Sequence, residues 1–363
     1  MKKTILFFAI ASLVFAICPA RSQTPRTSVV RLDPALDELL SQQAQVQLVK
    51  GGFGVTEGIN WVQRGKTGYL VFSDIPANVV NKMTPDGQVS VLVKESGYQG
   101  PWNGYTMMMI GGIFTYGLQP GDPNYRQVVL VGSDGLTFDP QGRLLLCAYS
   151  TRAVQRIEKN GKRVTIADRY QGKRFNGPND VAVKKDGTIY FSDTYGGMRG
   201  RANDPSKEIN SESFYMVRND ITSIAIQANP DELSGANGLA FSPDEKYLYV
   251  NNGDKSVWRY EVQADDTLAN GRQIADLKGE QGPGITDGMK VDSKGNLYQS
   301  GPGGIWIFSP EGGRLGMIRT PEVVGNLTFG DPDFKTLYIA ARTSIFKVRL
   351  NTPGLPCNSC THH

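Results

Sequence analysis

Short apolar runs alternate with turn-forming residues along most of the chain. After about residue 45, helical periodicity is nearly absent and apolar positions recur at the two-residue period of a β-strand. One unit repeats: a polar residue, usually followed by glycine, then an apolar alternation, a turn rich in Asp, Pro or Gly, and a second β-rich run. The pattern predicts an all-β fold built from repeated modules. Six copies begin at Glu57, Asp134, Asn179, Asn237, Asp287 and Asn326.

The strand count within each module predicts the architecture. A third strand-like run follows every copy, and five copies have a fourth; the sixth has none, because its β pattern stops near Asn351. The strand-like segment Ala44–Val49 precedes the first copy and can supply the missing strand, which would remove an exposed sheet edge. We therefore expect residues 44–351 to form a six-bladed β-propeller with four antiparallel strands per blade and a ring closed by the N-terminal strand. An open β-sandwich would leave the sixfold recurrence unexplained.

The two ends of the chain differ from this pattern. Residues 1–22 combine Lys2 and Lys3 with the apolar run Ile5–Ile17 and small residues up to Ser22, which is typical of a secretory signal peptide. The apolar run is shorter than the roughly 20 residues that a bilayer span needs. We expect a periplasmic or secreted protein with no membrane span, an N-terminal arm over residues 23–43 and a C-terminal tail over residues 352–363.

Composition excludes several classes of function. The only histidines are His362 and His363, so the folded body has no imidazole for a catalytic triad, a metal site or acid–base chemistry. Lys and Arg number 39 against 35 Asp and Glu, and loss of the leader would remove basic residues only; a near-neutral body argues against nucleic acid as a partner. Cys357 and Cys360 can form a disulfide, a metal clip or neither. An oxidising compartment favours a disulfide remote from the functional site.

The first polar position of each module carries the candidate chemistry. The innermost strand of each propeller blade lines the central channel, so these six positions would converge at one rim. All six side chains carry oxygen, and carboxylate and amide oxygens without nitrogen or sulfur favour a hard cation. The alternative is that Asn-Gly and Asp-Gly merely form turns, but each copy has a separate turn signal a few residues later. We expect one divalent metal, with Ca²⁺ favoured and Mg²⁺, Mn²⁺ or Zn²⁺ also able to bind.

Four segments resemble a known family, and the resemblance spans roughly Val46 to Leu350. The family is that of gluconolactonase, senescence marker protein (regucalcin) and luciferin-regenerating enzyme. Its members are six-bladed propellers that hold one divalent metal in the channel and mostly hydrolyse sugar lactones. The matching segments are TEGINW (Thr56–Trp61), NGPNDVAVKKDGTIYFSD (Asn176–Asp193), NGLAFSPD (Asn237–Asp244) and TDGMKVDSKGNLY (Thr286–Tyr298).

The resemblance implies roles for individual residues. Glu57, Asn237 and Asp287 would bind the metal, and Asn179 would be a fourth ligand or a substrate-binding amide. The metal would polarise a lactone carbonyl while Asp287 activates water or, as an alternative, acts as the nucleophile. Asp134 would lie behind the metal ligands, as would Asn326.

Substrate contacts are expected from two further places. Arg174 and Tyr195 flank the third module's motif, and Trp102 lies in a long insertion, Gly97–Gly132. This insertion is expected either to cover the channel mouth as an apolar wall or to pack as a hairpin on the propeller's side. The wall would consist of Trp102, Tyr105, Phe114 and Tyr116.

These features favour a metal-dependent lactonase acting on a small-molecule lactone. Two other functions are compatible with the same ring of oxygens. One is a phosphotriesterase-like hydrolase, since the metal would polarise P=O as readily as C=O. The other is a non-catalytic ligand-binding propeller with a structural Ca²⁺. The sequence does not indicate the oligomeric state.

Overall fold

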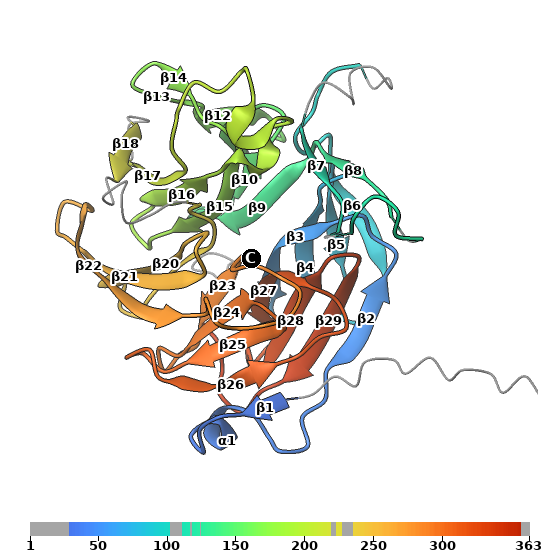
Figure 1. The fold of residues 1–363 in the computed structure, drawn as a ribbon, viewed down its shortest axis with the longest axis vertical. Helices are drawn as coiled ribbons and strands as arrows, with labels where there is room; N and C mark the ends of the chain where they lie inside the picture. The colour runs from blue at the N-terminus through green and yellow to red at the C-terminus, as the bar shows by residue number, and fades with distance from the viewer. Residues whose placement is uncertain are drawn as a thin grey trace, which may run out of the picture.

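Six antiparallel sheets surround a central axis in the computed structural model (Figure 1). The model describes residues 29–101, 111–116, 118–123, 125–218, 223–226 and 235–356. The innermost strands of the sheets contact one another in order around the axis, and the last contacts the first. The predicted six-bladed β-propeller is therefore confirmed. The innermost strands are β3, β9, β15, β19, β23 and β27.

Each of the first three blades has four strands in sequence order from hub to rim. The first blade has β3 (Thr56–Arg64), β4 (Thr67–Asp74), β5 (Val79–Met83) and β6 (Val89–Lys94). The second has β9 (Ser133–Phe138), β10 (Leu144–Ala148), β11 (Ala153–Ile157) and β12 (Arg163–Ala167). The third has β15 (Pro178–Val183), β16 (Ile189–Asp193), β17 (Ser213–Val217) and β18 (Ser223–Ile226).

The last two blades include strands from the N-terminal part of the chain. The outermost strand of the sixth blade is β2 (Gln47–Gly51), which pairs with β29, and the fifth blade gains a fifth strand, β1 (Val29–Arg31), which pairs with β26.

The fourth blade has β19 (Leu239–Phe241), β20 (Tyr247–Asn251), β21 (Ser256–Val262) and β22 (Leu268–Asp276). The fifth has β23 (Met289–Val291), β24 (Leu297–Gly301), β25 (Gly304–Phe308) and β26 (Arg314–Ile318). The sixth has β27 (Val324–Gly330), β28 (Thr336–Ala341) and β29 (Ser344–Arg349).

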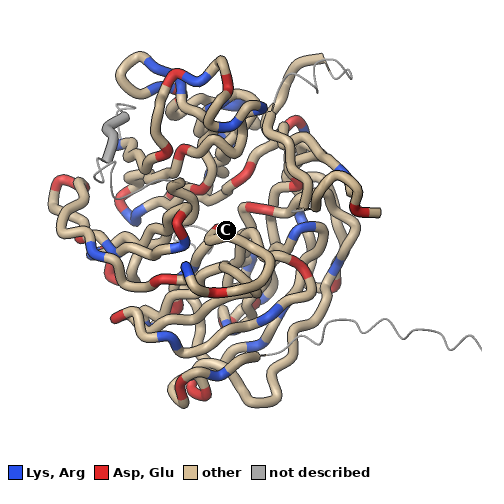
Figure 2. Tube along the Cα trace, viewed as in Figure 1, with Lys and Arg blue, Asp and Glu red and all other residues tan. Residues whose placement is uncertain are grey.

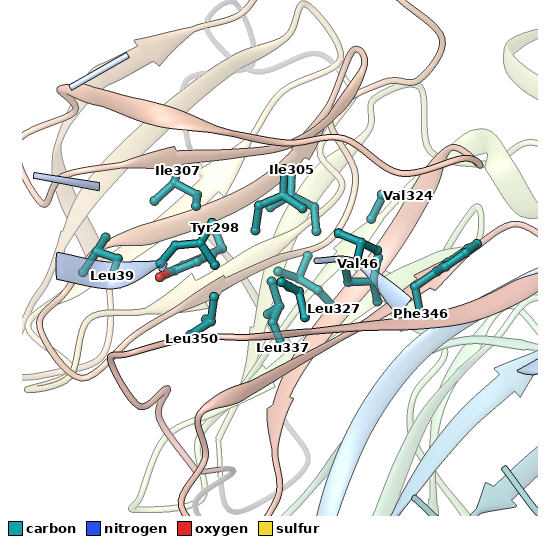
Figure 3. Close-up of a cluster of buried hydrophobic side chains, with 14 of the residues drawn as sticks. Leu39, Val46, Tyr298, Ile305, Ile307, Val324, Leu327, Leu337, Phe346 and Leu350 are labelled. Carbon is teal, nitrogen blue, oxygen red and sulfur yellow. The ribbon is translucent and has the colours of Figure 1, made fainter. Parts of the chain in front are cut away.

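The segment expected to be an N-terminal arm packs on the propeller where it is described. Besides β1, it forms the one-turn helix α1 (Leu36–Leu39). Leu36 and Leu39 are buried in the apolar cluster between the fifth and sixth blades, which Figure 3 shows together with Tyr298 and Leu327. The predicted signal peptide, residues 1–22, lies outside the described residues, as do Cys357 and Cys360. No helix of the described residues is long and apolar enough to cross a membrane.

Burial follows the position of a strand within its blade. The middle strands are packed between two neighbouring blades, so every residue of β10, β16, β25 and β28 is buried. The outer strand β6, by contrast, is almost wholly exposed. Burial on both faces explains why the middle strands are nearly continuous apolar runs, whereas alternation persists where one face meets solvent.

The long insertion and the loop after β16 shape one end of the channel. The hairpin of β7 (Gly112–Phe114) and β8 (Val128–Leu130) arises from the long insertion. A Cβ on Gly112 would collide with the carbonyl oxygen of Gly196, so β7 lies directly against the third blade's loop. That loop holds the short 3₁₀ turns η1 (Tyr195–Gly197) and η2 (Arg201–Asn203). A second hairpin joins β13 (Arg169–Tyr170) and β14 (Lys173–Arg174).

Candidate active site and metal centre

The channel opens into a cavity of about 310 Å³ at the N-terminal ends of the innermost strands. Five of the six predicted hub residues line this one cavity. The sixth, Asn326, is not among its lining residues: its amide oxygen accepts from the backbone N–H of Leu327 (2.9 Å) and from the Lys290 ammonium (3.4 Å). The folded chain thus brings together the oxygen-bearing side chains predicted from the repeats. They are Glu57, Asp134, Asn179, Asn237 and Asp287.

The glycines after the hub residues permit close approach between blades and do not act as hairpin turns. A Cβ on Gly58 would collide with the carbonyl oxygen of Asp134 in the next blade, and φ at Gly58 is +55°. The same collision would occur between Gly135 and the Asn179 carbonyl. The structure therefore disfavours the alternative in which these dipeptides only make turns. Equivalent crowding occurs for Gly238 against Asp287 and for Gly288 against Asn326.

A second set of polar residues holds the segments that carry the hub residues. Asp74, at the end of β4, accepts from the backbone N–H of Gly54 (3.1 Å), just before β3. Asp193, at the end of β16, accepts from the backbone N–H groups of Asn176 (2.8 Å) and Gly177 (2.7 Å), just before β15. Sequence analysis did not assign this role. The signal was present as the repeated Phe-Ser-Asp that ends both second strands.

The carboxyl groups in the cavity repel one another, and acidic segments of several blades border the central opening in Figure 2. Burial raises the pKa of Glu57 well above its usual range, and repulsion from Asp287 and Asp134 raises it further. Burial likewise raises the pKa of Asp134 well above its usual range, and the pKa of Asp287 to about 7. Arg342 and a hydrogen bond from Asn237 partly offset the shift at Asp287. Buried carboxyls arranged this way favour a bound cation.

The amide groups are oriented so that oxygen can face such a cation. The Asn237 side-chain oxygen is buried and has no hydrogen-bond partner within the described residues. Asn179 Nδ2 donates to Asp134 Oδ2 (2.6 Å) and to the Tyr149 hydroxyl (2.6 Å), and that hydroxyl donates to Asp134 Oδ2. A carboxylate only accepts, so Nδ2 must face Asp134 and Oδ1 is left for another ligand.

The residues present fit a hard dication. Among the described residues, no three carboxylate, thiol or imidazole groups are placed to hold a metal on their own, so amide oxygens would have to complete the site. Two carboxylates and two amides would balance the charge of such an ion and leave positions for water and substrate. The residues able to hold it are Glu57, Asn179, Asn237 and Asp287.

The structure does not place Arg174 and Tyr195, the predicted substrate contacts, in the cavity lining. Arg174 lies in β14, away from the cavity lining, and its guanidinium donates to the carbonyl of Thr151 (3.2 Å), because the β13–β14 hairpin carries it off the rim. The Tyr195 ring lies beside the Lys207 ammonium at 5.2 Å and is likewise absent from the lining. Trp102 and Tyr105 lie outside the described residues.

The described part of the insertion contributes to the cavity, as predicted for an apolar wall. Several other lining residues were not predicted from the sequence. Phe114 of β7 lines the cavity, and Tyr116 packs edge-on against it with ring centroids 5.0 Å apart. This observation supports the apolar wall over the side-packed hairpin for the described part of the insertion. The lining residues that sequence analysis did not single out include Tyr149, Arg201, Glu212 and Arg342.

Comparison with known proteins identifies the class to which this fold and cavity belong. The chain belongs to the SMP-30/gluconolactonase/LRE-like family, whose model matches residues 55–343. It is 33% identical over 336 residues to a gluconolactonase of Zymomonas mobilis, covering 90% of this chain and 87% of that protein.

Solved structures agree. A gluconolactonase from Xanthomonas campestris superimposes with a TM-score of 0.69 at 27% identity, over 89% of this chain and 94% of that one. A luciferin-regenerating enzyme, at 18% identity, shares the fold with a TM-score of 0.62, over 86% of this chain and 98% of that one.

Proposed function

We propose that this protein is a divalent-metal-dependent lactonase that opens the cyclic ester of a small sugar-type lactone. The observation that carries the proposal is the convergence of carboxylate and amide oxygens on one cavity, with the buried Asn237 oxygen unpartnered among the described residues. The likeness to a gluconolactonase over nearly the whole chain supports the same conclusion.

Glu57, Asn179, Asn237 and Asp287 would hold the metal, and the all-oxygen donor set favours Ca²⁺ over Mg²⁺, Mn²⁺ or Zn²⁺. When bound, the ion polarises the lactone carbonyl and stabilises the negative charge that develops on its oxygen. The protein's own groups perform the remaining work. Tyr149 and Asp134 fix the amide of Asn179, so that its oxygen faces the cavity.

Asp287 is the proposed general base. Water adds its oxygen to the carbonyl carbon and gives a proton to the Asp287 carboxylate; the ring C–O bond then breaks, and the proton passes to the departing ring oxygen, leaving a hydroxy acid. The chain offers no histidine for this transfer within the described residues. In the alternative mechanism Asp287 attacks the carbonyl carbon itself.

The test is a hydrolysis panel on protein that has been stripped with a chelator and reconstituted with each divalent ion. We expect activity on sugar lactones to disappear with the metal and to return most fully with Ca²⁺. Full activity after stripping would contradict metal dependence. An organophosphate triester in the same panel separates the lactonase from a phosphotriesterase. No turnover of either ester, with calcium still bound, would leave the non-catalytic propeller.

Localisation is proposed on the leader alone. Residues 1–22 have the charge and apolar pattern of a secretory signal, which favours a periplasmic or secreted enzyme. Fractionation of cells that express the full chain tests this assignment. A protein found in the cytosol at full length would contradict it.

A further inference from the structure

Arg342 is held in an unusual backbone conformation in the lining of the cavity. It lies in the turn between β28 and β29 at φ +47°, a left-handed conformation that is uncommon outside glycine. Its guanidinium lies over the ring of Phe114, 4.2 Å from the centroid, and the residue lines the cavity. The turn and the aromatic ring together hold the charged group at the mouth.

The N–H donors of the Arg342 guanidinium have no acceptor among the described residues. Among the described residues, no hydrogen bond and no ion pair to it is formed, although it lies close enough to Asp287 and Glu57 for electrostatic attraction. An arginine fork carries five N–H donors, and partly buried donors normally find acceptors. Because stacking on Phe114 satisfies none of these donors, they are available to a molecule in the cavity.

A second guanidinium lines the same cavity. Arg201, in η2, donates to the carbonyl of Ile113 (3.3 Å), the residue before Phe114. The strand β7 therefore organises two arginines, one over a side chain and one on its backbone. Glu57, Asn237 and Asp287 reach the same cavity from the hub.

We propose that Arg342, assisted by Arg201, recognises an anionic substituent on the lactone, so that the preferred substrate is a sugar lactone bearing a carboxylate or a similar anion. The inference rests on the proposed lactonase function and specifies its substrate class. A planar guanidinium binds a carboxylate through two parallel hydrogen bonds, whereas a hydroxyl group engages only part of the fork. The hub then holds the ester while the two arginines hold the charged end.

The experiment compares two lactones that differ at one carbon. The 1,4-lactones of D-gluconate and D-glucarate share a ring, but the second carries a carboxylate at C6 where the first has a hydroxymethyl group. We expect the wild type to favour the glucarate lactone. Because Arg342 also lies near Asp287, Arg342→Gln should lower kcat/KM for both lactones, but roughly 10- to 100-fold more for the glucarate lactone than for the gluconate lactone. Arg342→Lys keeps the charge but lacks the planar fork. Its kcat/KM for the glucarate lactone should lie between the values for the wild type and for Arg342→Gln.

The matched control is Arg126→Gln. Arg126 also stacks on an aromatic ring, 4.2 Å from the centroid of Tyr116, but it is exposed and does not line the cavity. The Arg126→Gln variant should have the same kcat/KM as the wild type for both lactones. An equal loss for both lactones in Arg342→Gln would overturn the inference, because Arg342 would then act on the reaction and not on the substituent. Unchanged turnover of the glucarate lactone would overturn it as well.

Failure of the proposed function can be separated from failure of this inference. If the wild type hydrolyses neither lactone, the lactonase proposal falls. Calorimetric binding of D-glucarate to wild type and Arg342→Gln then decides the inference alone. Binding weakened roughly tenfold or more in the variant sustains the anion site, and equal binding overturns it.

Discussion

The two ends of the channel are built from the same six strands but carry different ionisable groups. At the N-terminal ends of the strands the cavity is lined by carboxylates, amides and two guanidiniums. At the other end a cavity of about 290 Å³ is lined by apolar residues such as Leu136, Val181 and Leu239, by Lys185, Glu245 and Lys290, and by Leu355 and Pro356 of the C-terminal segment. The innermost strands all run from the first cavity to the second. The position of a residue along an innermost strand, and not the blade it belongs to, therefore decides whether its side chain reaches the candidate active site.

The largest expected effect is the loss of turnover on replacing Asp287. Asp287→Ala removes the proposed base and one proposed metal ligand, so kcat/KM for a sugar lactone should fall roughly a thousandfold or more. The matched change at the opposite cavity is Thr137→Val, which should leave turnover unaffected. Initial rates on variants with unchanged circular dichroism measure both effects. A loss below tenfold in Asp287→Ala would contradict its role.

A substitution beside the second cavity should lower the stability of the fold and leave the turnover of lactones unchanged. A Cβ on Gly354 would overlap the ring of Phe329, so Gly354→Ala must displace either the C-terminal segment or the ring. We expect the free energy of unfolding to fall by about 1–3 kcal/mol, as in other overpacked sites, with kcat unchanged. Urea denaturation and lactone turnover on the same preparation would show it. A loss of turnover without a loss of stability would break the distinction between the two ends.

Tyr149 should matter for metal affinity through Asn179. Tyr149→Phe removes an acceptor of the Asn179 amide and a donor to Asp134, so calcium should bind about tenfold more weakly. Tyr190→Phe is the control, because that buried hydroxyl donates to the carbonyl of Asp266, away from the cavity lining. Calcium titration calorimetry compares the two variants. Equal affinities would mean that the network only stabilises the fold.

The smallest expected effect is a pH dependence of stability to which Asp287 contributes. An unfolded aspartate titrates near about 4, whereas burial raises the pKa of Asp287 to about 7 in the metal-free protein. Between these values the native state binds more protons than the unfolded state, so stability should fall as pH rises from about 4 to 7.

We therefore expect the melting temperature of stripped protein to drop by a few degrees between pH 5 and 8, and added calcium to restore more of it at the higher pH. Asp287→Asn should reduce the slope without abolishing it, because burial also raises the pKa of Asp193 to about 7. An identical slope in that variant would exclude Asp287 as its source.

The comparison also explains what the sequence could predict. Glu57 and Asp287 were found because each starts a repeated strand, and a closed ring brings equivalent positions to one rim whatever the blade. Tyr149 and Arg342 follow the second strands of their blades in turns whose side-chain directions no periodic pattern specifies. Arg174 shows that closeness in sequence to a hub residue is not enough, because it belongs to the β13–β14 hairpin and does not line the cavity.

Crowding at the hub has a consequence for how such an enzyme can be altered. The glycine after the hub residue of one blade packs against the backbone of the next blade's hub residue, as for Gly58 with Asp134 and Gly238 with Asp287. A blade transplanted from a relative must therefore bring a compatible neighbour with it. The unit of exchange is the junction between two blades, and a library that shuffles whole blades at their boundaries will discard most of its active members there.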